Sequence, residues 1–203
     1  MLNIYQALSK TVVINKGNRL ISYDDSLELV GTGRSAFVFR VKSTNHAMKL
    51  FFPVFSYLAK EEASIYEVLK GIVYFPSIYE VGANYIVMDY VEGLTLFECM
   101  SHGKIITSTH LKEIDYALSL AANRGLNPSD IHLRNIFIMS TGSIKIIDVT
   151  RFRQKKECSQ WPNLKKAYKQ FYCRRWFPKK IPAFLLNIIA FFYKKDLIPY
   201  YRT

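Results

Sequence analysis

Cysteine is scarce in this sequence, and the few cysteines present are poorly placed for cross-linking or metal binding. Cys99, Cys158 and Cys173 are separated along the 203 residues, and none belongs to a Cys-x-x-Cys or Cys/His cluster. An odd number of separated cysteines predicts free thiols in a reducing compartment. The sequence therefore argues against a disulfide scaffold and against a structural zinc site.

The sequence also lacks an apolar run long enough to span a membrane. Its longest run, residues 181–193, has 13 residues and contains Pro182 and Asn187, whereas a spanning helix needs about 20. The start MLNIYQALSKTVVINKGN lacks the basic residues and apolar stretch of a secretory signal. We therefore expect a cytoplasmic protein, and the short apolar run is compatible with a peripheral position on a membrane surface.

Acidic residues are nearly missing from the last quarter of the chain. Residues 1–150 hold 14 Lys and Arg and 14 Asp and Glu, whereas residues 151–203 hold 14 Lys and Arg against only Glu157 and Asp196. The whole net charge of +12 thus lies at one end. This asymmetry predicts an anionic partner, which could be RNA, a membrane surface or an acidic protein, unless the basic end is only a solvated face.

Aromatic residues alternate with the cations of this basic region; they are Trp161, Tyr168, Phe171, Tyr172, Trp176 and Phe177. Such a mixture can stack nucleic-acid bases while the cations meet phosphates, or it can lie on anionic lipid. Our preferred interpretation for most of the aromatics is that they complete a core. A region this short needs its apolar residues, and the cations would then face water.

Residue patterning predicts an α+β protein. The first half should form five strands and one helix: three strands within 26–51, a helix over 56–70 capped by Ser56, and strands near 77–81 and 84–91. The second half should be mainly helical: helices over 95–102 and 108–123, a hairpin of strands 136–139 and 144–147, and basic helices broken by Pro162, Pro178 and Pro182. The predicted domains are an extension over 1–25, a first lobe over 26–91 and a second lobe over 92–203 with its basic end at 151–203.

Neither a Rossmann fingerprint nor a Walker loop is present, yet a glycine-containing loop, Gly31–Val38, separates the first two predicted strands. Glycines at such a position let the backbone fold over a phosphate chain with its N–H groups pointing at it. Taken alone, a Gly-x-Gly between strands is more often an ordinary hairpin. The phosphate-binding interpretation of this loop is supported only by the residues that follow it along the chain.

Lys49 is the only lysine within the apolar strand that comes next, and a lysine in a buried strand needs an anionic partner. Glu61 and Glu62 of the following helix are the candidate partners. The alternative for Lys49 is a strand-end lysine that reaches solvent.

A polar loop, Asp130–Asn135, and a later acid, Asp148, complete the constellation. Asp148 ends the apolar strand 144–147. A carboxylate there, with an asparagine and a second carboxylate on a nearby loop, can hold magnesium and orient a nucleophile. Each acid alone could simply form a turn, but that explanation does not account for the lysine and the glycine loop in the same order.

Together these motifs resemble the protein-kinase fold from about Leu27 to Phe152. The resemblance implies a two-lobed fold, with a five-stranded antiparallel first lobe and a minimal second lobe, and ATP and magnesium as cofactors. It also favours Glu62, which precedes Ala63 as in small atypical kinases, as the partner of Lys49, then Glu61, then Glu67. It implies a nucleotide site formed by Gly31, Thr32, Gly33, Arg34, Ser35, Ala36, Val38, Ala47, Lys49, Glu62, Met88, Asp89, Val91 and Thr95. Within this set, the backbone of Asp89 and Val91 would meet the adenine, Met88 would be the gatekeeper and Thr95 would lie near the ribose.

The resemblance also implies the catalytic roles. Asp130 would orient the acceptor hydroxyl and accept its proton, Lys49 would hold phosphates, and Asn135 and Asp148 would bind magnesium. His132 would support the γ-phosphate region or only hydrogen-bond within its loop. Its Asp-x-His-x-x-Asn pattern is similar to that of aminoglycoside and choline kinases.

The departures from the family pattern are informative. Ala36 replaces the third loop glycine, Pro128-Ser129 replaces His-Arg, Asp-Phe-Gly has become Asp148-Val149-Thr150, and no Ala-Pro-Glu is present after it. The chain therefore resembles the smallest kinases: the RIO group, the kinase of the tRNA threonylcarbamoylation complex and, most of all, bacterial serine/threonine kinases of the YrzF type. The expected activity is phosphorylation of Ser/Thr in a protein substrate. The alternatives are a small-molecule kinase, an ATPase, or a pseudokinase that serves as a nucleotide-binding scaffold.

Overall fold

The computed structural model describes residues 4–195 and residue 197, and the chain divides into two units. Unit 1 comprises Met1–Val91 together with Asp148–Thr150, and unit 2 comprises Glu92–Ile147 and Arg151–Thr203. Both units contain helices and antiparallel strands, so the predicted α+β class is confirmed. The three residues Asp148–Thr150 return to the first unit although the chain around them belongs to the second.

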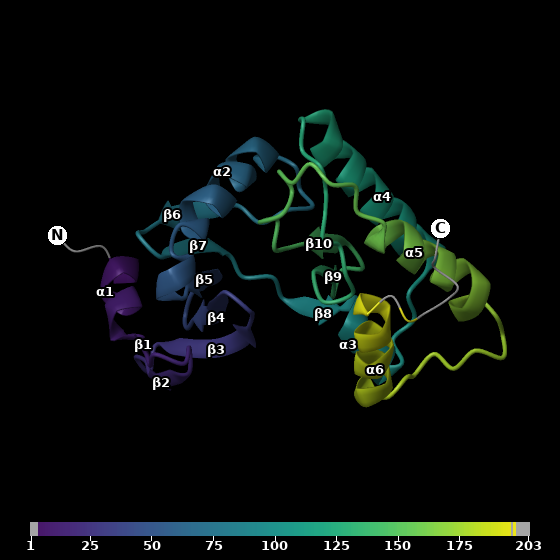
Figure 1. The fold of residues 1–203 in the computed structure, drawn as a ribbon, viewed down its shortest axis with the longest axis horizontal. Helices are drawn as coiled ribbons and strands as arrows, with labels where there is room; N and C mark the ends of the chain where they lie inside the picture. The colour runs from purple at the N-terminus through teal and green to yellow at the C-terminus, as the bar shows by residue number, and fades with distance from the viewer. Residues whose placement is uncertain (1–3, 196, 198–203) are drawn as a thin grey trace. The chain divides into compact units, whose positions relative to one another are not determined.

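Unit 1 is built on a five-stranded antiparallel sheet, whose strands the alternating pattern predicted (Figure 1). In spatial order its strands are β3 (Leu27–Thr32), β4 (Ala36–Val41), β5 (His46–Phe51), β7 (Tyr85–Asp89) and β6 (Ile78–Val81). One face carries a cluster that includes Phe37, Phe39, Met48, Leu50 and Val87. Because successive side chains of a strand point to opposite faces, Val38, Ala47 and Lys49 share the other face.

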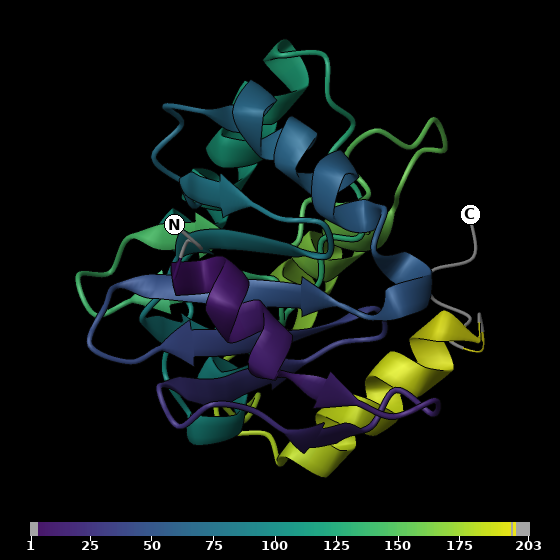
Figure 2. The same ribbon diagram turned by 90° about the vertical axis from the view of Figure 1, so that its left-hand side faces the viewer.

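The first residues of the chain belong to this core. They form α1 (Ile4–Thr11), β1 (Val13–Ile14) and β2 (Leu20–Ser22). Leu8 of α1 is buried among Leu27, Phe39 and the rest of the cluster, and Figure 2 shows α1 in front of the sheet strands. Residues 1–25, which the sequence left as an extension, therefore cover one face of the sheet from residue 4 onward.

Helix α2 (Leu58–Leu69) packs against β5, β6 and β7. The predicted cap at Ser56 is wrong. The N-cap of α2 is Tyr57, whose side chain makes no capping hydrogen bond. A short 3-10 turn, η1 (Pro53–Phe55), precedes the helix. Pro53 sets the φ of the turn, so the chain enters the helix through this tight turn rather than through a serine cap.

Unit 2 contains a three-stranded antiparallel sheet that the sequence predicted only in part. The hairpin β9 (Ile136–Met139) and β10 (Ile144–Ile146) was expected, but β8 (Gly93–Thr95) also pairs with β9. A Cβ atom at Gly93 would lie 2.6 Å from the carbonyl oxygen of Ile138, so glycine is needed for this close approach. Helices α3 (Leu96–His102) and α4 (Ser108–Asn123) lie between β8 and β9 along the chain, as predicted.

The basic end of unit 2 forms α5 (Gln160–Ala167), a π-helical turn η2 (Tyr168–Tyr172) and α6 (Ala183–Lys194). Pro162 was expected to break this region but lies in the first turn of α5, where a backbone N–H has no partner within the helix. Trp161 and Tyr172 are buried, as the preferred interpretation expected, whereas Phe171 and Trp176 are exposed. The predicted basic region reaches residue 203, and its residues 196 and 198–203 lie outside the described part of the chain.

The packing of α1 yields a stability prediction. We expect Leu8→Ala to lower the free energy of unfolding by about 2 kcal/mol or more, because it empties a buried position in the sheet core. Ile4→Ala on the same helix removes an exposed side chain and should change stability by less than about 0.5 kcal/mol. Urea unfolding followed by circular dichroism measures both. Equal effects would mean that α1 does not pack on the sheet.

Candidate functional site

The sequence-predicted site residues fall into two groups, one in each unit, and each group is described in turn. The centre of the first group is Lys49 in β5. Lys49 pairs across the sheet with Val38 on one side and Ile86 on the other, and Ala47 pairs with Met88. Directly opposed residues share a face, so these pairings bring Val38, Ala47, Lys49 and Met88 to the same face of the sheet.

The ammonium group of Lys49 is buried between two carboxylates. Its Nζ atom lies 2.6 Å from Oε2 of Glu62 and 3.0 Å from Oδ1 of Asp148. The Glu62 side chain is fully buried, whereas that of Asp148 is partly exposed. Lysine is rarely buried without a charged partner, and two such partners are present here.

Helical periodicity explains why Glu62 pairs with Lys49. The buried face of α2 consists of Ala59, Glu62, Ile65, Tyr66 and Leu69, which recur every three or four residues. Glu62 lies within this stripe, while Glu61 and Glu67 are exposed. The carboxylate that the sequence favoured is therefore the one that reaches the sheet.

Thr150 joins the same group, and sequence reasoning missed this contact. Its hydroxyl oxygen lies 2.8 Å from Oε2 of Glu62 and 3.0 Å from Oδ1 of Asp148, so its single proton can be donated to either carboxylate. Thr150 stands where the kinase pattern has glycine. In the sequence, Thr150 is marked only by its position two residues after Asp148, a candidate metal ligand. A pattern of two residues is too short to predict a contact.

The electrostatics of this group leave negative charge in excess. Burial alone would lower the pKa of Lys49, but the charges of Glu62 and Asp148 outweigh it and raise that pKa above its ordinary value. The pKa of Glu62 is raised, because its carboxyl group is buried and lies near Asp148, although Lys49 acts in the opposite direction. Two carboxylates thus share one ammonium group.

This donor set fits a divalent cation and a phosphate chain. Among the described residues, Oε1 of Glu62 is a buried oxygen without a hydrogen-bond partner, and the Asp148 carboxylate reaches the surface. Carboxylate oxygens are the ligands that Mg²⁺ prefers, and Mg²⁺ commonly uses one or two of them together with phosphate oxygens. The excess negative charge beside Lys49 is what such a cation would neutralise.

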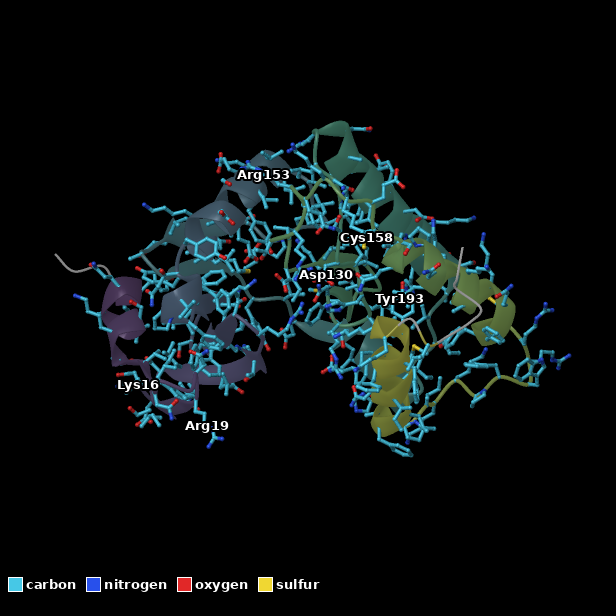
Figure 3. All side chains as sticks on the ribbon, in the orientation of Figure 1. Lys16, Arg19, Asp130, Arg153, Cys158 and Tyr193 are labelled. Carbon is cyan, nitrogen blue, oxygen red and sulfur yellow. The ribbon has the colours of Figure 1, made fainter. Side chains whose placement is uncertain are left out.

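The second group is the loop Asp130–Asn135 in unit 2, where Asp130 is labelled in Figure 3. The Asn135 side chain donates from Nδ2 to the carbonyl oxygen of Asp130 at 3.1 Å, which closes the loop. Nδ1 of His132 accepts from the backbone N–H of Arg134 at 3.3 Å, so His132 hydrogen-bonds within the loop. The N–H of Ile147, the residue before Asp148, donates to the carbonyl oxygen of Asn135 at 2.9 Å.

Asp130 has a charged neighbour that the sequence did not suggest. Oδ2 of Asp130 lies 3.4 Å from Nε of Arg151, and the Asp130 side chain is mostly buried whereas that of Arg151 is largely exposed. Arg151 directly follows Thr150, and nothing in its sequence surroundings distinguishes it from the other cations of the basic end.

Both candidate acids have an uncommon backbone conformation. Asp130 has φ 60° and Asp148 has φ 58°, in the left-handed region that most L-residues avoid. Aspartate tolerates this region better than most residues, yet it still costs about 1 kcal/mol or more. The surrounding structure holds both carboxylates in strained positions, a pattern typical of functional sites.

The glycine loop forms a closed turn in the structure. The N–H of Gly33 donates to the carbonyl oxygen of Ala36 at 2.9 Å, and the carbonyl oxygen of Ser35 accepts from Phe52. Gly31 pairs with Val38, and Thr32 pairs with Phe37. Arg34 is exposed at the tip. The Gly33 N–H, which the sequence assigned to a phosphate, is thus engaged within the hairpin in this conformation.

The residues predicted to contact adenine and ribose differ in burial and in hydrogen bonding. The N–H of Asp89 donates to the carbonyl oxygen of Ser77 at 3.0 Å and is thus engaged within the sheet. Val91 is the last residue of the first segment of unit 1 and is half-buried. Thr95 is buried as the N-cap of α3 and forms a capping box with Glu98. That structural role accounts for Thr95 without a ligand.

The charge cluster around Lys49 yields a testable coupling. We expect Lys49→Met to lower the free energy of unfolding by about 3 kcal/mol, because Glu62 is then buried without a counter-ion. Adding Glu62→Gln should recover about 1 kcal/mol or more of this loss. Urea unfolding of the wild type, both single variants and the double variant measures the coupling, and Lys60→Met, an exposed change on α2, is the control. If the stability losses of Lys49→Met and Glu62→Gln simply added in the double variant, Lys49 and Glu62 would not form a buried ion pair.

The chain has a relative among known proteins. The chain is 45% identical over 201 residues to a protein of Bacillus subtilis (strain 168) named "Putative serine/threonine-protein kinase YrzF". The alignment covers 97% of this chain and 94% of that protein. No protein-family model matches the chain. Identity at this level over nearly the whole length of both proteins shows common descent, and the chain belongs to the YrzF family of kinase-like proteins.

Proposed function

We propose that this protein is an ATP- and magnesium-dependent phosphotransferase that moves the γ-phosphate of ATP to a Ser/Thr hydroxyl of a protein. In this proposal unit 1 is the first lobe of a kinase fold, and unit 2 is a minimal second lobe. The observation that carries the proposal is the buried cluster of Lys49, Glu62 and Asp148. Its lysine is held in place by a fully buried carboxylate, and its second carboxylate remains partly open to solvent.

Each residue of the cluster has a separate task. Lys49 donates to the α- and β-phosphates of ATP, and Glu62 fixes the position of the ammonium group. Asp148 and Asn135 are the proposed ligands of magnesium, and Thr150 orients the Asp148 carboxylate through its hydroxyl. When bound, Mg²⁺ neutralises negative charge on the β- and γ-phosphates.

The loop in unit 2 supplies the acid–base chemistry. Asp130 orients the acceptor hydroxyl and accepts its proton as the new phosphate ester bond forms. Arg151, beside the Asp130 carboxylate, helps to hold its orientation. His132 has a hydrogen bond within the loop, which favours a structural role for it over a direct phosphate contact.

The nucleotide base would meet the face of the sheet that carries Val38, Ala47 and Met88. Their side chains are apolar, and the Asp89 carbonyl lies at the end of the same strand as Met88. The proposed phosphate-covering loop is the hairpin of Gly31–Val38. Because the Gly33 N–H is engaged in that hairpin, the proposal requires this turn to rearrange when phosphate binds.

A labelling assay tests the proposal. With ATP carrying a radiolabelled γ-phosphate, magnesium and a generic basic protein as acceptor, wild type should transfer label to protein. Asp130→Asn should lower the transfer rate by about 10²-fold or more, and Asp148→Asn should abolish magnesium-dependent transfer. Asparagine is chosen because it also tolerates the left-handed backbone conformation of both positions.

Asp25→Asn provides the matched control, since it makes the same change at an exposed residue of unit 1 and should leave the rate unchanged. Release of free phosphate without labelled protein would favour an ATPase or a small-molecule kinase instead. Nucleotide binding with no turnover by wild type, with or without acceptor, would favour a pseudokinase.

A further inference from the structure

Helix α6 exposes an unusual amount of apolar surface. Phe184, Leu185, Ile188, Ile189, Phe191 and Phe192 have relative exposures between 40% and 63%. Within the helix only Leu186 is buried, and Tyr193 is half-buried. Soluble proteins rarely expose a large continuous apolar patch, because its contact with water is unfavourable. Such a patch therefore often marks a binding surface.

The exposed apolar residues form one continuous face. Phe184, Ile188 and Phe191 follow each other at helical spacings of four and three, and Leu185, Ile189 and Phe192 form a second row beside them. We call these six residues the α6 outer face. Ile189 also lines a cavity at the packed side of the helix, whereas the other five residues of the outer face do not, so most of the face is available for a partner.

Contacts on its other side hold α6 in unit 2. Leu186 packs with Phe97 and Ile181, and α3 is the helix beside α6 (Figure 1). The hydroxyl of Tyr193, labelled in Figure 3, accepts from Nδ2 of Asn163 at 3.0 Å. The apolar content of α6 is therefore only partly used in packing, and a largely apolar cavity of about 560 Å³ also separates parts of α6 from α5.

Cations flank the outer face at both ends of the helix. Lys179 and Lys180 precede α6, and Lys194 and Lys195 end it. Residues 158–195 contain nine Lys and Arg residues and no Asp or Glu. Trp176, on the segment that leads into the helix, is 72% exposed. Tryptophan and lysine beside an apolar face are the residues enriched where proteins meet a bilayer interface.

We propose that the α6 outer face and its flanking cations bind the surface of an anionic lipid membrane. The 12 residues of α6 span about 18 Å, which is shorter than the hydrocarbon core of a bilayer. In the part of the chain that the structure describes, no helix is suited to crossing a membrane. The helix would lie in the interface with its outer face in the acyl region and its cations near anionic headgroups.

The chemistry of the outer face favours lipid over RNA. Three of its six residues are aliphatic and three are phenylalanine, and cations occur only at the ends of the helix. Single-stranded RNA is bound by aromatic side chains that alternate with cations along the backbone path. Aliphatic side chains such as Ile188 and Ile189 give neither stacking nor phosphate contacts, but they gain free energy on entering the acyl region.

Vesicle co-sedimentation of the full chain tests this inference, which does not depend on kinase activity. Wild type should bind vesicles of phosphatidylcholine with about one-third phosphatidylglycerol, and should bind pure phosphatidylcholine vesicles much more weakly. Ile188→Ser/Phe191→Ser should lower the partition coefficient by about tenfold or more, because both side chains leave the acyl region. Val73→Ser/Tyr116→Ser removes a similar pair of exposed apolar side chains elsewhere and should bind like wild type.

A second set of variants tests how much the flanking cations contribute to vesicle binding. Lys180→Gln/Lys194→Gln/Lys195→Gln should weaken binding to the anionic vesicles by about fivefold for each cation. Lys16→Gln/Lys60→Gln/Lys112→Gln changes the net charge equally at exposed sites outside the basic region and should have a smaller effect. Circular dichroism and thermal unfolding verify that every variant remains folded.

Three outcomes would overturn the inference. The outer-face variant could bind vesicles as tightly as wild type. The chain could bind single-stranded RNA in the same buffer while ignoring vesicles, which would assign the basic end to nucleic acid. Alternatively, analytical ultracentrifugation could reveal a dimer that the outer-face variant disrupts, with no binding to vesicles, in which case the partner is a second copy of the chain.

Discussion

The ammonium group of Lys49 cannot remain buried without negative charge beside it, and much of unit 1 is organised by that constraint. One partner, Glu62, lies 13 residues away on α2, and the other, Asp148, lies 99 residues away after β10. A buried charge without a partner would cost several kcal/mol. The same contacts that hold Lys49 in place therefore tie a distant segment, Asp148–Thr150, to the first unit. Stability and the proposed chemistry rest on one cluster.

That cluster is not neutral, and its imbalance connects fold to function. Two carboxylates face one ammonium group, and one oxygen of Glu62 lacks a hydrogen-bond partner among the described residues. The fully buried Glu62 needs Lys49 as its counter-ion, whereas the Asp148 side chain is 46% exposed and can carry the excess charge in contact with water. A partly exposed carboxylate beside the Lys49 ammonium group, held at a positive φ, is the feature on which the proposed magnesium site rests.

The sequence predicted those features that depend on local periodicity or on a required partner. Alternation indicated the five strands of unit 1, since a one-residue slip would expose Phe39 or Met48. The kinase resemblance favoured Glu62 over Glu61, and the buried stripe of α2 explains why Glu62 is the carboxylate that reaches Lys49. The rest depends on contacts between residues far apart in sequence: β8 has only three residues, Leu8 fills a space made by distant strands, and the roles of Thr150 and Arg151 exist only once the chain folds back.

Within unit 2, helix α6, which carries the proposed membrane face, and the proposed catalytic loop share a direct contact. The guanidinium group of Arg134, next to Asn135, donates from Nη2 to Oδ1 of Asn187 on α6 at 2.9 Å and lies 3.5 Å from the ring centroid of Phe97. Binding of α6 to a surface would restrict the helix that holds Arg134, and hence the loop of Asp130–Asn135. Since coupling between binding sites is reciprocal, a ligand that orders this loop would also strengthen membrane binding. The hydrogen bond between Arg134 and Asn187 is thus the contact through which the proposed membrane binding and the proposed chemistry would influence each other.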